Sequence, residues 1–234
     1  MSRWQVIDGL QIAIDGPSGS GKGTIAALVG AELALPVLDT GLLYRYIGWR
    51  AAEQGVSLDD ENAVLSMLDR AIASMLWKPQ GIFLKEADVE KDCTSQLRDE
   101  NAGARASQVA AMPQVRAALL GVQRDIAKMG CIMDGRDIGT VVLPDAQAKF
   151  FLTASQRERA RRRWSQLKAK GEDADLERIA AELKARDARD KDRDCAPLEK
   201  AVDVIHIDST TMRMDDVVDR ILNILERRKL IKKL

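Results

Sequence analysis

The chain has 234 residues, with 36 lysine and arginine residues against 36 aspartate and glutamate residues, so its formal net charge is zero. An overall basic excess for binding nucleic acid or a membrane surface is thereby excluded, and any positive site must be local. Hydrophobic residues make up 46% of the chain, which is enough for a full core. No apolar run approaches the ~20 residues of a membrane span, and the start MSRWQVIDG lacks the features of a signal peptide, so we expect a cytoplasmic protein.

The first predicted element is a short strand at residues 10–14, which leads through a glycine-rich loop into an alanine-rich helix from about Thr24 to Leu33. Four more short apolar runs predict buried strands, at 36–38, 131–133, 148–152 and 202–207. Strands of this kind separated by helical stretches are typical of an α/β fold, so we predict a five-stranded parallel sheet flanked by helices. Ligands of such sheets bind beyond the carboxyl ends of the strands.

Two stretches interrupt this alternation. Residues 74–85 have the pattern of a hairpin whose turn is Lys78-Pro79-Gln80-Gly81, which predicts a small antiparallel insert. Residues 156–193 are strongly charged with a helical pattern, broken at Lys170-Gly171-Glu172-Asp173. The last predicted helix runs from Met214 to about Lys229, carries an apolar stripe and ends in a basic tail.

Cysteine and histidine are too sparse for metal or redox chemistry. Cys93, Cys131 and Cys195 are far apart and have no CxxC spacing, so we expect reduced thiols. His206 is the only histidine, which excludes a multi-histidine metal site. It lies in the apolar run at 202–207, and we interpret it as a strand histidine with a satisfied hydrogen bond.

The sharpest chemical signal is the segment Gly16-Pro17-Ser18-Gly19-Ser20-Gly21-Lys22-Gly23-Thr24, which we name the phosphate loop. It has the GxxxxGK spacing of a nucleotide-binding loop and lies between a strand and a helix, as that motif requires. Its glycines let backbone N–H groups point at phosphate oxygens, the helix N-terminus adds positive potential, and Lys22 reaches the β- and γ-phosphates. Gly23 stands where a magnesium-ligating Ser or Thr is common, with Thr24 one residue later. The alternative is a glycine-rich turn without a ligand.

A phosphate loop is shared by GTPases, ATP-driven motors, small-molecule kinases and nucleotide-sensing adaptors. A GTPase needs an Asn/Thr-Lys-x-Asp element late in the sheet to read its base. The last predicted strand continues as Ile205-His206-Ile207-Asp208-Ser209-Thr210 and offers nothing of that form. A switch GTPase is therefore disfavoured.

Four further segments accompany the phosphate loop, in this order: Asp39-Thr40-Gly41-Leu42-Leu43-Tyr44-Arg45, Ala106-Ser107-Gln108-Val109-Ala110-Ala111-Met112-Pro113-Gln114-Val115-Arg116, Asp134-Gly135-Arg136-Asp137-Ile138-Gly139-Thr140-Val141-Val142 and Arg186-Asp187-Ala188-Arg189-Asp190. With them the chain resembles the bacterial cytidylate kinases over almost its whole length. The resemblance implies transfer of the γ-phosphate of ATP to CMP or dCMP, with Mg²⁺ as cofactor. It also implies a monomer that binds neither nucleic acid nor membranes.

The resemblance further implies one domain at residues 10–230. Its core comprises 10–40, 105–155 and 195–230, its insert at 41–104 binds the nucleoside monophosphate, and a lid with the following charged helix occupies 156–194. The catalytic group it assigns is Lys22, Asp134, Arg136, Arg186 and Arg189. It assigns ATP binding to the phosphate loop with Arg159 and Arg162. It assigns acceptor binding to Asp39, Thr40, Tyr44, Arg45, Ser107, Arg116, Arg136, Asp137, Arg186 and Asp190.

The base-reading residues suit the chemistry of cytosine, which presents an amino donor at N4 and acceptors at N3 and O2. Asp137 can accept from N4, while Arg116 and Ser107 can donate to N3 and O2. Uracil reverses the polarity at N3 and at position 4, so Asp137 would face an oxygen, a mismatch that a buried site rejects. The resemblance assigns Asp190 and Arg186 to the ribose hydroxyls.

Simpler interpretations stay open for several of these residues. Asp134 is expected to hold magnesium through water, and its alternative is a helix or turn cap; capping competes equally for Asp39. Arg159, Arg162 and Arg163 would share one face of a lid helix that hinges near Lys170. The alternatives for this arginine run are a solvated helix face or a nonspecific nucleic-acid patch.

Two other functions compete with a cytidylate kinase. One is a sibling phosphate-loop kinase for another small acceptor, which fails if Ser107, Arg116 and Asp137 read a cytosine. The other is a catalytically silent binding module, such as a nucleotide-sensing or RNA-binding adaptor. Retention of Lys22 together with the full arginine set argues against lost catalysis.

Overall fold

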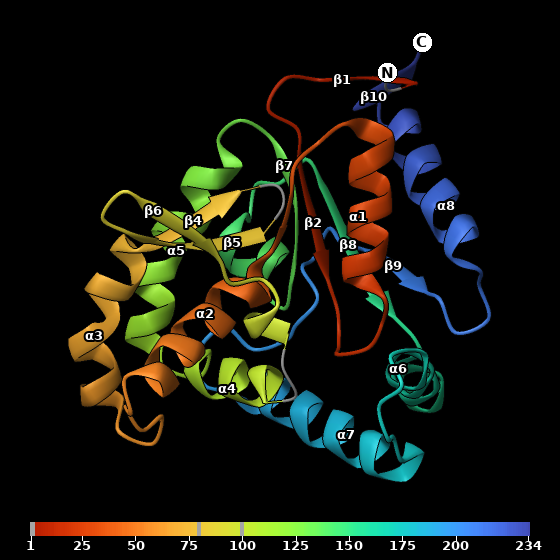
Figure 1. The fold of residues 1–234 in the computed structure, drawn as a ribbon. Helices are drawn as coiled ribbons and strands as arrows, with labels where there is room; N and C mark the ends of the chain where they lie inside the picture. The colour runs from red at the N-terminus through yellow and green to blue at the C-terminus, as the bar shows by residue number, and fades with distance from the viewer. Residues whose placement is uncertain (1–2, 79–80, 99–100) are drawn as a thin grey trace. The chain divides into compact units, whose positions relative to one another are not determined.

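A five-stranded parallel sheet organises most of the chain (Figure 1). The computed structural model describes residues 3–78, 81–98 and 101–234. The strand order is β3 (Val37–Asp39), β7 (Cys131–Gly135), β2 (Gln11–Asp15), β8 (Ala148–Thr153) and β9 (Ile205–Asp208). The five predicted strands and the α/β class are confirmed. The last strand begins at Ile205, three residues later than predicted, because Val202 is fully exposed beside a turn.

Strands β2, β7 and β8 are nearly continuous buried runs, because successive residues on both faces of each strand are shielded from solvent. On one face, Ile12, Ile14 and Phe150 pack with α1 (Lys22–Leu33) and α8 (Met214–Arg227), which lie on the same side of the sheet (Figure 1). Each such fully buried side chain contributes ~1.5–3 kcal/mol relative to an exposed one. Helix α1 begins at Lys22, two residues earlier than predicted, directly after Gly21.

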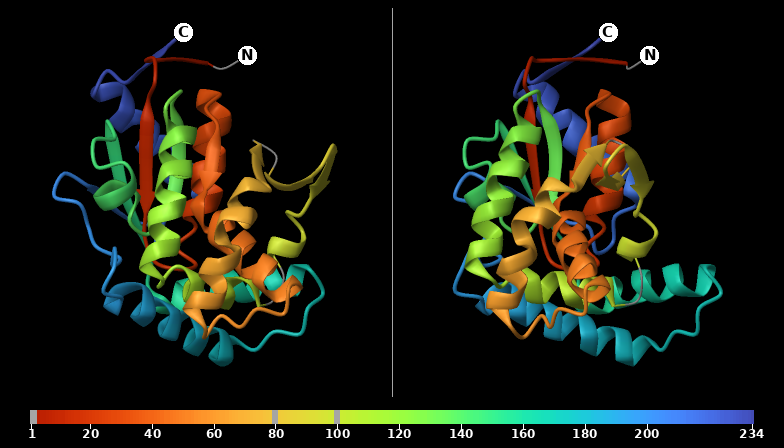
Figure 2. Two further views of the ribbon diagram at one scale, coloured as in Figure 1. Left: turned by 90° about the vertical axis from the view of Figure 1, so that its left-hand side faces the viewer. Right: turned by 60° about the vertical axis from the view of Figure 1, so that its left-hand side comes forward.

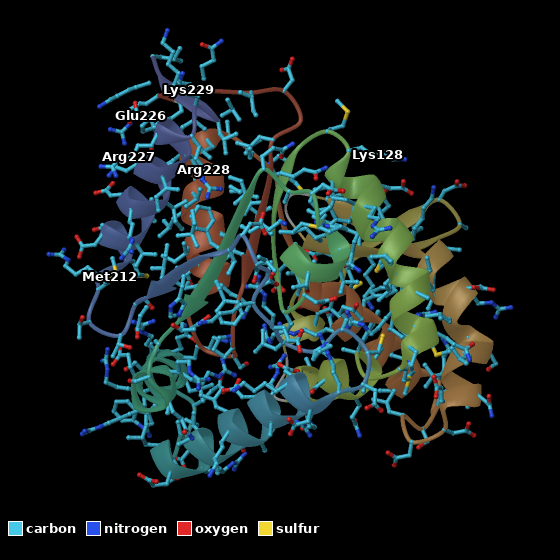
Figure 3. The ribbon with its side chains drawn as sticks, turned by 180° about the vertical axis from the view of Figure 1, so that it is seen from behind. Lys128, Met212, Glu226, Arg227, Arg228 and Lys229 are labelled. Atoms are coloured by element: carbon cyan, nitrogen blue, oxygen red, sulfur yellow. The ribbon has the colours of Figure 1, made fainter. Side chains whose placement is uncertain are left out.

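Two compact units divide the chain: Met1–Leu38 with Ile126–Leu234, and Asp39–Asp125. In the first unit, β1 (Trp4–Val6) pairs antiparallel with β10 (Ile231–Lys233). These three-residue strands were not predicted because so short a run carries no readable alternation. Helix α8 ends at Arg227, two residues before its predicted end, since the backbone of Lys229 turns with φ of 59°. Figure 3 shows the Arg228 side chain directed toward the sheet, where it donates to the Gln147 carbonyl at 3.5 Å.

The charged stretch of the first unit forms two helices, α6 (Gln156–Ala169) and α7 (Leu176–Asp192), which pack against each other. The break between them falls where the sequence predicts it, and Figure 2 shows it as one loop at the end of the pair. Both helices begin at a side-chain cap: Ser155 accepts from the Glu158 N–H and Asp175 accepts from the Arg178 N–H. A short π-helix, η2 (Ile138–Val142), follows β7.

The second unit contains α2 (Thr40–Glu53), α3 (Glu61–Ala73), the 3₁₀ turn η1 (Gln96–Arg98), α4 (Ala102–Val109) and most of α5 (Pro113–Ala127). Its antiparallel sheet has the order β4 (Met75–Lys78), β5 (Gly81–Glu86) and β6 (Val89–Asp92). The predicted hairpin is confirmed in β4 and β5, while its turn residues Pro79 and Gln80 lie outside the described residues. Strand β6 was missed because every residue in it is exposed and it has no apolar pattern. Among the described helices, none combines the length and apolarity that crossing a membrane requires.

Two helical glycines give opposite predictions for the same substitution. A Cβ on Gly30 in α1 would overlap the Val37 side chain and lie 3.0 Å from the Leu35 carbonyl oxygen, whereas a Cβ on Gly121 in α5 would meet nothing within 4 Å. Gly30→Ala is expected to lower the free energy of unfolding by about 1–3 kcal/mol through overpacking. Gly121→Ala is expected to raise it by about 0.4–1 kcal/mol, because alanine loses less backbone entropy. Urea unfolding of both variants checks this, and equal shifts in one direction would contradict it.

Candidate active site

The phosphate loop connects β2 to α1 and has the backbone that its sequence demands. The Cβ of any larger residue at Gly16 would overlap the Leu152 carbonyl group, so only glycine fits where the loop passes β8. Gly21 occupies the N-cap of α1 in the left-handed region, with φ of 91°, and supplies no side-chain cap. The first turn of α1 also lacks an acidic residue, so the amino end of the helix favours an anion. Lys22, only 8% exposed, folds back over the loop, and its Nζ donates to the Pro17 carbonyl at 3.2 Å.

Helices α6 and α7 hold the phosphate loop through a partly buried ion pair. The Arg159 guanidinium donates to the Ser18 carbonyl at 2.8 Å and to the Asp187 carboxylate at 2.5 Å. The same carboxylate accepts from the Ser18 N–H at 3.1 Å, so both polar backbone groups of Ser18 are engaged. Arg159 is therefore a loop-supporting residue in this structure. The sequence indicated no role for Asp187, which appeared only within the segment from Arg186 to Asp190.

Arg162, one turn further along α6, secures the other end of the loop. It donates to the Ser20 carbonyl at 3.2 Å and to the Ser209 carbonyl at 2.6 Å. Glu158 binds both Arg161 and Arg162, and the hydrogen bond from Arg161 is the main reason that the pKa of Glu158 falls to about 2. Arg163 is exposed, so it does not share the buried environment of Arg159 as the helical spacing suggested.

The segment Asp134–Asp137 emerges beside the phosphate loop because β7 is the parallel neighbour of β2. Asp134 lies within β7 and is 5% exposed, so it does not occupy a helix-capping position. Its Oδ2 is 3.6 Å from the position that a Cβ on Gly23 would occupy. The glycine thus leaves room between the carboxylate and the start of α1.

The space between Asp134 and the start of α1 fits a Mg²⁺ ion that is also bound by a nucleotide. Magnesium prefers oxygen ligands, retains several waters and is commonly held by one or two carboxylates together with phosphate oxygens. Asp134 offers one carboxylate next to the phosphate loop. Within residues 3–78, 81–98 and 101–234, no cluster of three or more His, Cys, Asp or Glu side chains forms an all-protein metal cage.

Three arginines surround the buried Asp190 of α7. The Arg136 Nε donates to its carboxylate at 2.7 Å. Burial raises the pKa of Asp190, but the charges of Arg136, Arg186 and Arg193 outweigh it and hold the pKa below its usual value. Arg189 is exposed on the same helix.

Arg193 is a site residue that the sequence reasoning missed. Its Nε donates to the Ala196 carbonyl at 2.6 Å, and its Nη2 is 3.5 Å from the Asp137 Oδ1. Both the Arg193 and the Asp137 side chains are less than a tenth exposed. The sequence did contain a signal for Arg193, because residues spaced like 186, 190 and 193 fall on one face of a helix. The motif considered in the sequence ended at Asp190, three residues too early.

The second unit gathers its own predicted residues around α2. Thr40 and Tyr44 lie on that helix and are buried. The Arg116 guanidinium lies over the Tyr44 ring at 5.5 Å from its centre and donates to the Ala110 carbonyl at 3.2 Å. Ser107 on α4 is 8% exposed, and its Oγ has no hydrogen-bond partner among the described residues, which suits a hydroxyl that binds a ligand.

Two further predicted residues lie at the start of α2. Asp39 stands at the N-cap of α2, yet its side chain makes no capping hydrogen bond. The capping interpretation of Asp39 is therefore not supported. Arg45 donates to the Leu97 carbonyl at 3.4 Å.

Histidine and cysteine lie apart from this chemistry. His206 is exposed on β9, and its Nε2 is 2.9 Å from the Thr153 hydroxyl, as a hydrogen-bonded strand histidine should be. The three cysteines are free thiols, and burial raises the pKa of Cys131 to about 12. A thiol of that pKa is a poor nucleophile.

A glycine-rich loop at the start of a helix, a buried lysine and clustered arginines define a phosphate-loop phosphotransferase. The cytidylate kinase family model matches residues 12–227, and the chain belongs to that family. It is 48% identical over 225 residues to a cytidylate kinase of Pseudomonas putida (strain KT2440) and 49% identical over 225 residues to one of Pseudomonas entomophila (strain L48). Each alignment covers 94% of this chain and 97% of the relative.

Among solved structures, the chain is similar in fold to an uncharacterized protein from Eubacterium ventriosum ATCC 27560. The TM-score is 0.51 at 14% sequence identity, and the match covers 94% of this chain and 99% of that one. At this identity the likeness concerns the fold alone.

The ion pair on Ser18 generates a prediction about ATP. Asp187→Ala removes the acceptor of the Ser18 N–H and the partner of Arg159, so the loop loses its support from α7. We expect the KM for ATP to rise about tenfold to hundredfold, in line with ~1.5–3 kcal/mol for hydrogen bonds to charged groups. Steady-state kinetics measures this, with Glu182→Ala, an exposed carboxylate on the same helix, as the control. An unchanged KM for ATP in the folded Asp187→Ala variant would contradict a supporting role.

Proposed function

We propose that this chain transfers the γ-phosphate of ATP to CMP or dCMP, giving ADP and CDP or dCDP. The observation that carries the proposal is the complete phosphate loop beside the Asp134–Asp137 segment, at the carboxyl ends of the adjacent strands β2 and β7. Membership of the cytidylate kinase family supports the nucleotide.

Phosphoryl transfer needs alignment, charge neutralisation and exclusion of water more than covalent chemistry by the protein. Lys22 and the N–H groups of the phosphate loop would hold the donor phosphates. Arg162 and Arg159 would act on the ATP side, Arg159 by keeping the loop in shape. This accounts for a site built from a lysine and arginines without a histidine base.

The Asp190 cluster would bind the acceptor. Arg136 would meet the phosphate of the nucleoside monophosphate, and Asp190 with Arg186 would meet its ribose. Because three arginines keep Asp190 ionised, its carboxylate is a ready acceptor for ribose hydroxyl donors. From the second unit, the acceptor-side residues are Asp39, Thr40, Tyr44 and Arg45. Arg189, which is exposed on α7, is proposed as a further catalytic residue.

Base selection would depend on hydrogen-bond polarity. Asp137 would accept from the cytosine amino group, and Arg116 with Ser107 would donate to the ring. Asp137 is 5% exposed, so a uracil oxygen in place of the amino group would leave a buried carboxylate mismatched. Such a mismatch supplies a preference for cytosine over uracil.

Magnesium would be held by Asp134 through water together with the ATP phosphates. When bound, it neutralises the charge that develops on the phosphate oxygens. The chain's own part is to present the Asp134 carboxylate and to leave space at Gly23. We further propose that the protein is cytoplasmic and, as the family resemblance implies, a monomer.

The direct test is ADP release with ATP and magnesium, with CMP, dCMP, UMP, AMP and GMP supplied separately. Strong activity with CMP and dCMP, and little with the others, is the expected result. Activity with a different nucleotide would support a kinase but contradict the base-reading roles of Ser107, Arg116 and Asp137. ATP binding without turnover on any acceptor would favour a silent binding module.

Lys22→Ala is predicted to remove most turnover and leave the fold intact. Only the ammonium group at the phosphate loop is lost, and loss of one such charge-stabilising group costs about 100-fold or more in kcat. Lys184→Ala, an exposed lysine on α7, is the matched control and should retain its activity. Turnover at the wild-type rate in a folded Lys22→Ala protein would refute the role of Lys22.

Asp137→Ala is predicted to weaken CMP far more than ATP. Loss of the acceptor leaves the cytosine amino group unpaired, which corresponds to about a tenfold to hundredfold rise in the KM for CMP. The exposed Asp145 after η2 provides the control variant Asp145→Ala. Equal losses for both nucleotides would show that Asp137 does not read the base.

A further inference from the structure

The buried carboxylate of Asp15 performs a task that its position in the sequence does not reveal. Asp15 ends β2, directly before the phosphate loop, and is 3% exposed. Its two oxygens accept hydrogen bonds from the backbone N–H groups of Ile138 and Gly139, each at 2.8 Å. These are the first two N–H groups of η2, which have no partner within their own helix.

Asp137 stands at the N-cap of the same helix, yet its side chain makes no capping hydrogen bond. Aspartate at an N-cap ordinarily accepts from the N–H two or three residues ahead, which here includes Gly139. Asp15 already occupies that donor. The Asp137 carboxylate instead faces Arg193 at 3.5 Å.

We infer that Asp15 is a positioning residue for base recognition: by capping η2 in place of Asp137, it keeps the Asp137 carboxylate out of the N-cap and on the side of Arg193, where it would meet the cytosine amino group. The inference rests on the base-reading role of Asp137 in the proposed function. Asp15 does not touch the base in this arrangement. It acts through the turn that carries Asp137.

The surroundings of Asp15 disfavour a negative charge, and the two backbone hydrogen bonds oppose that effect. Burial raises the pKa of Asp15 to about 6, against the lowering effect of the two backbone hydrogen bonds. The charged groups that face it are Asp137, which raises the pKa, and Lys22, which lowers it. A buried charge is unfavourable unless it is paired or hydrogen-bonded, so the N–H groups of Ile138 and Gly139 help to keep this carboxylate in place. Gly139 leaves room for the contact, because its Cβ would lie 3.4 Å from the Asp15 Oδ2 and 3.2 Å from the Lys149 Cδ.

The test is Asp15→Asn, which keeps the size of the side chain but turns one acceptor into a donor that faces a backbone N–H. The capping bond to Gly139 or Ile138 is lost, and Asp137 is then drawn back to cap its own helix. The quantity to measure is the ratio of kcat/KM for CMP to kcat/KM for UMP. A purely structural loss would lower both values and leave their ratio unchanged.

We expect the ratio to fall about tenfold in Asp15→Asn, with the KM for ATP changed less than the KM for CMP. In an Asp137→Asn background, adding Asp15→Asn should not change the ratio further, because the effects of residues that act as a unit are not additive. Asp203→Asn is the matched control: Asp203 pairs with Lys149 at 2.9 Å, is 63% exposed and should leave the ratio unchanged. Thermal unfolding shows whether each variant is folded, and Asp15→Ser replaces Asp15→Asn if the latter does not fold.

An unchanged ratio in folded, active Asp15→Asn would overturn the inference. So would an equal fall in the wild-type and Asp137→Asn backgrounds, because Asp15 would then act independently of Asp137. If Asp137→Asn alone leaves the ratio unchanged, the base-reading role itself fails and the inference falls with it. The single variant Asp137→Asn therefore separates the failure of the proposed function from the failure of the inference alone.

Discussion

Two hydrogen bonds from the backbone of Ile138 and Gly139 to Asp15 join the ends of the two strands on which the site is built. In the sheet, Asp15 is the direct partner of Gly135, so β2 and β7 end at the same level. The phosphate loop follows one strand, and Arg136 and Asp137 follow the other. A change that loosened this junction would displace the segment after β7 relative to the phosphate loop.

The phosphate loop is also held from a second direction, by side chains rather than by the sheet. Arg159, Asp187 and Arg162 reach it from α6 and α7 and engage the backbone of Ser18 and Ser20. These two helices are strongly charged, and the sequence favoured a mobile lid that contacts ATP. The structure shows that part of this charge supports the loop itself. Helices that contact the loop backbone can transmit their own position to the place where phosphates would bind.

The sequence predicted the five parallel strands, because buried strands appear as short apolar runs, and the phosphate loop, because its spacing is specific. It did not predict β6, which is exposed, or β1 and β10, which are too short to show a pattern. Arg193 was missed because the motif ended at Asp190 and because its partner Asp137 lies 56 residues away in the chain. Asp15 was missed for the same reason: its hydrogen bonds cross 123 and 124 residues, and nothing local marks them.

The most direct test of the account is a crystal structure of the enzyme with CMP bound. The account predicts a carboxylate oxygen of Asp137 within hydrogen-bond distance of the cytosine N4, while both oxygens of Asp15 keep the N–H groups of Ile138 and Gly139. An Asp137 side chain that caps its own helix, or a cytosine amino group bound by another residue, would contradict it.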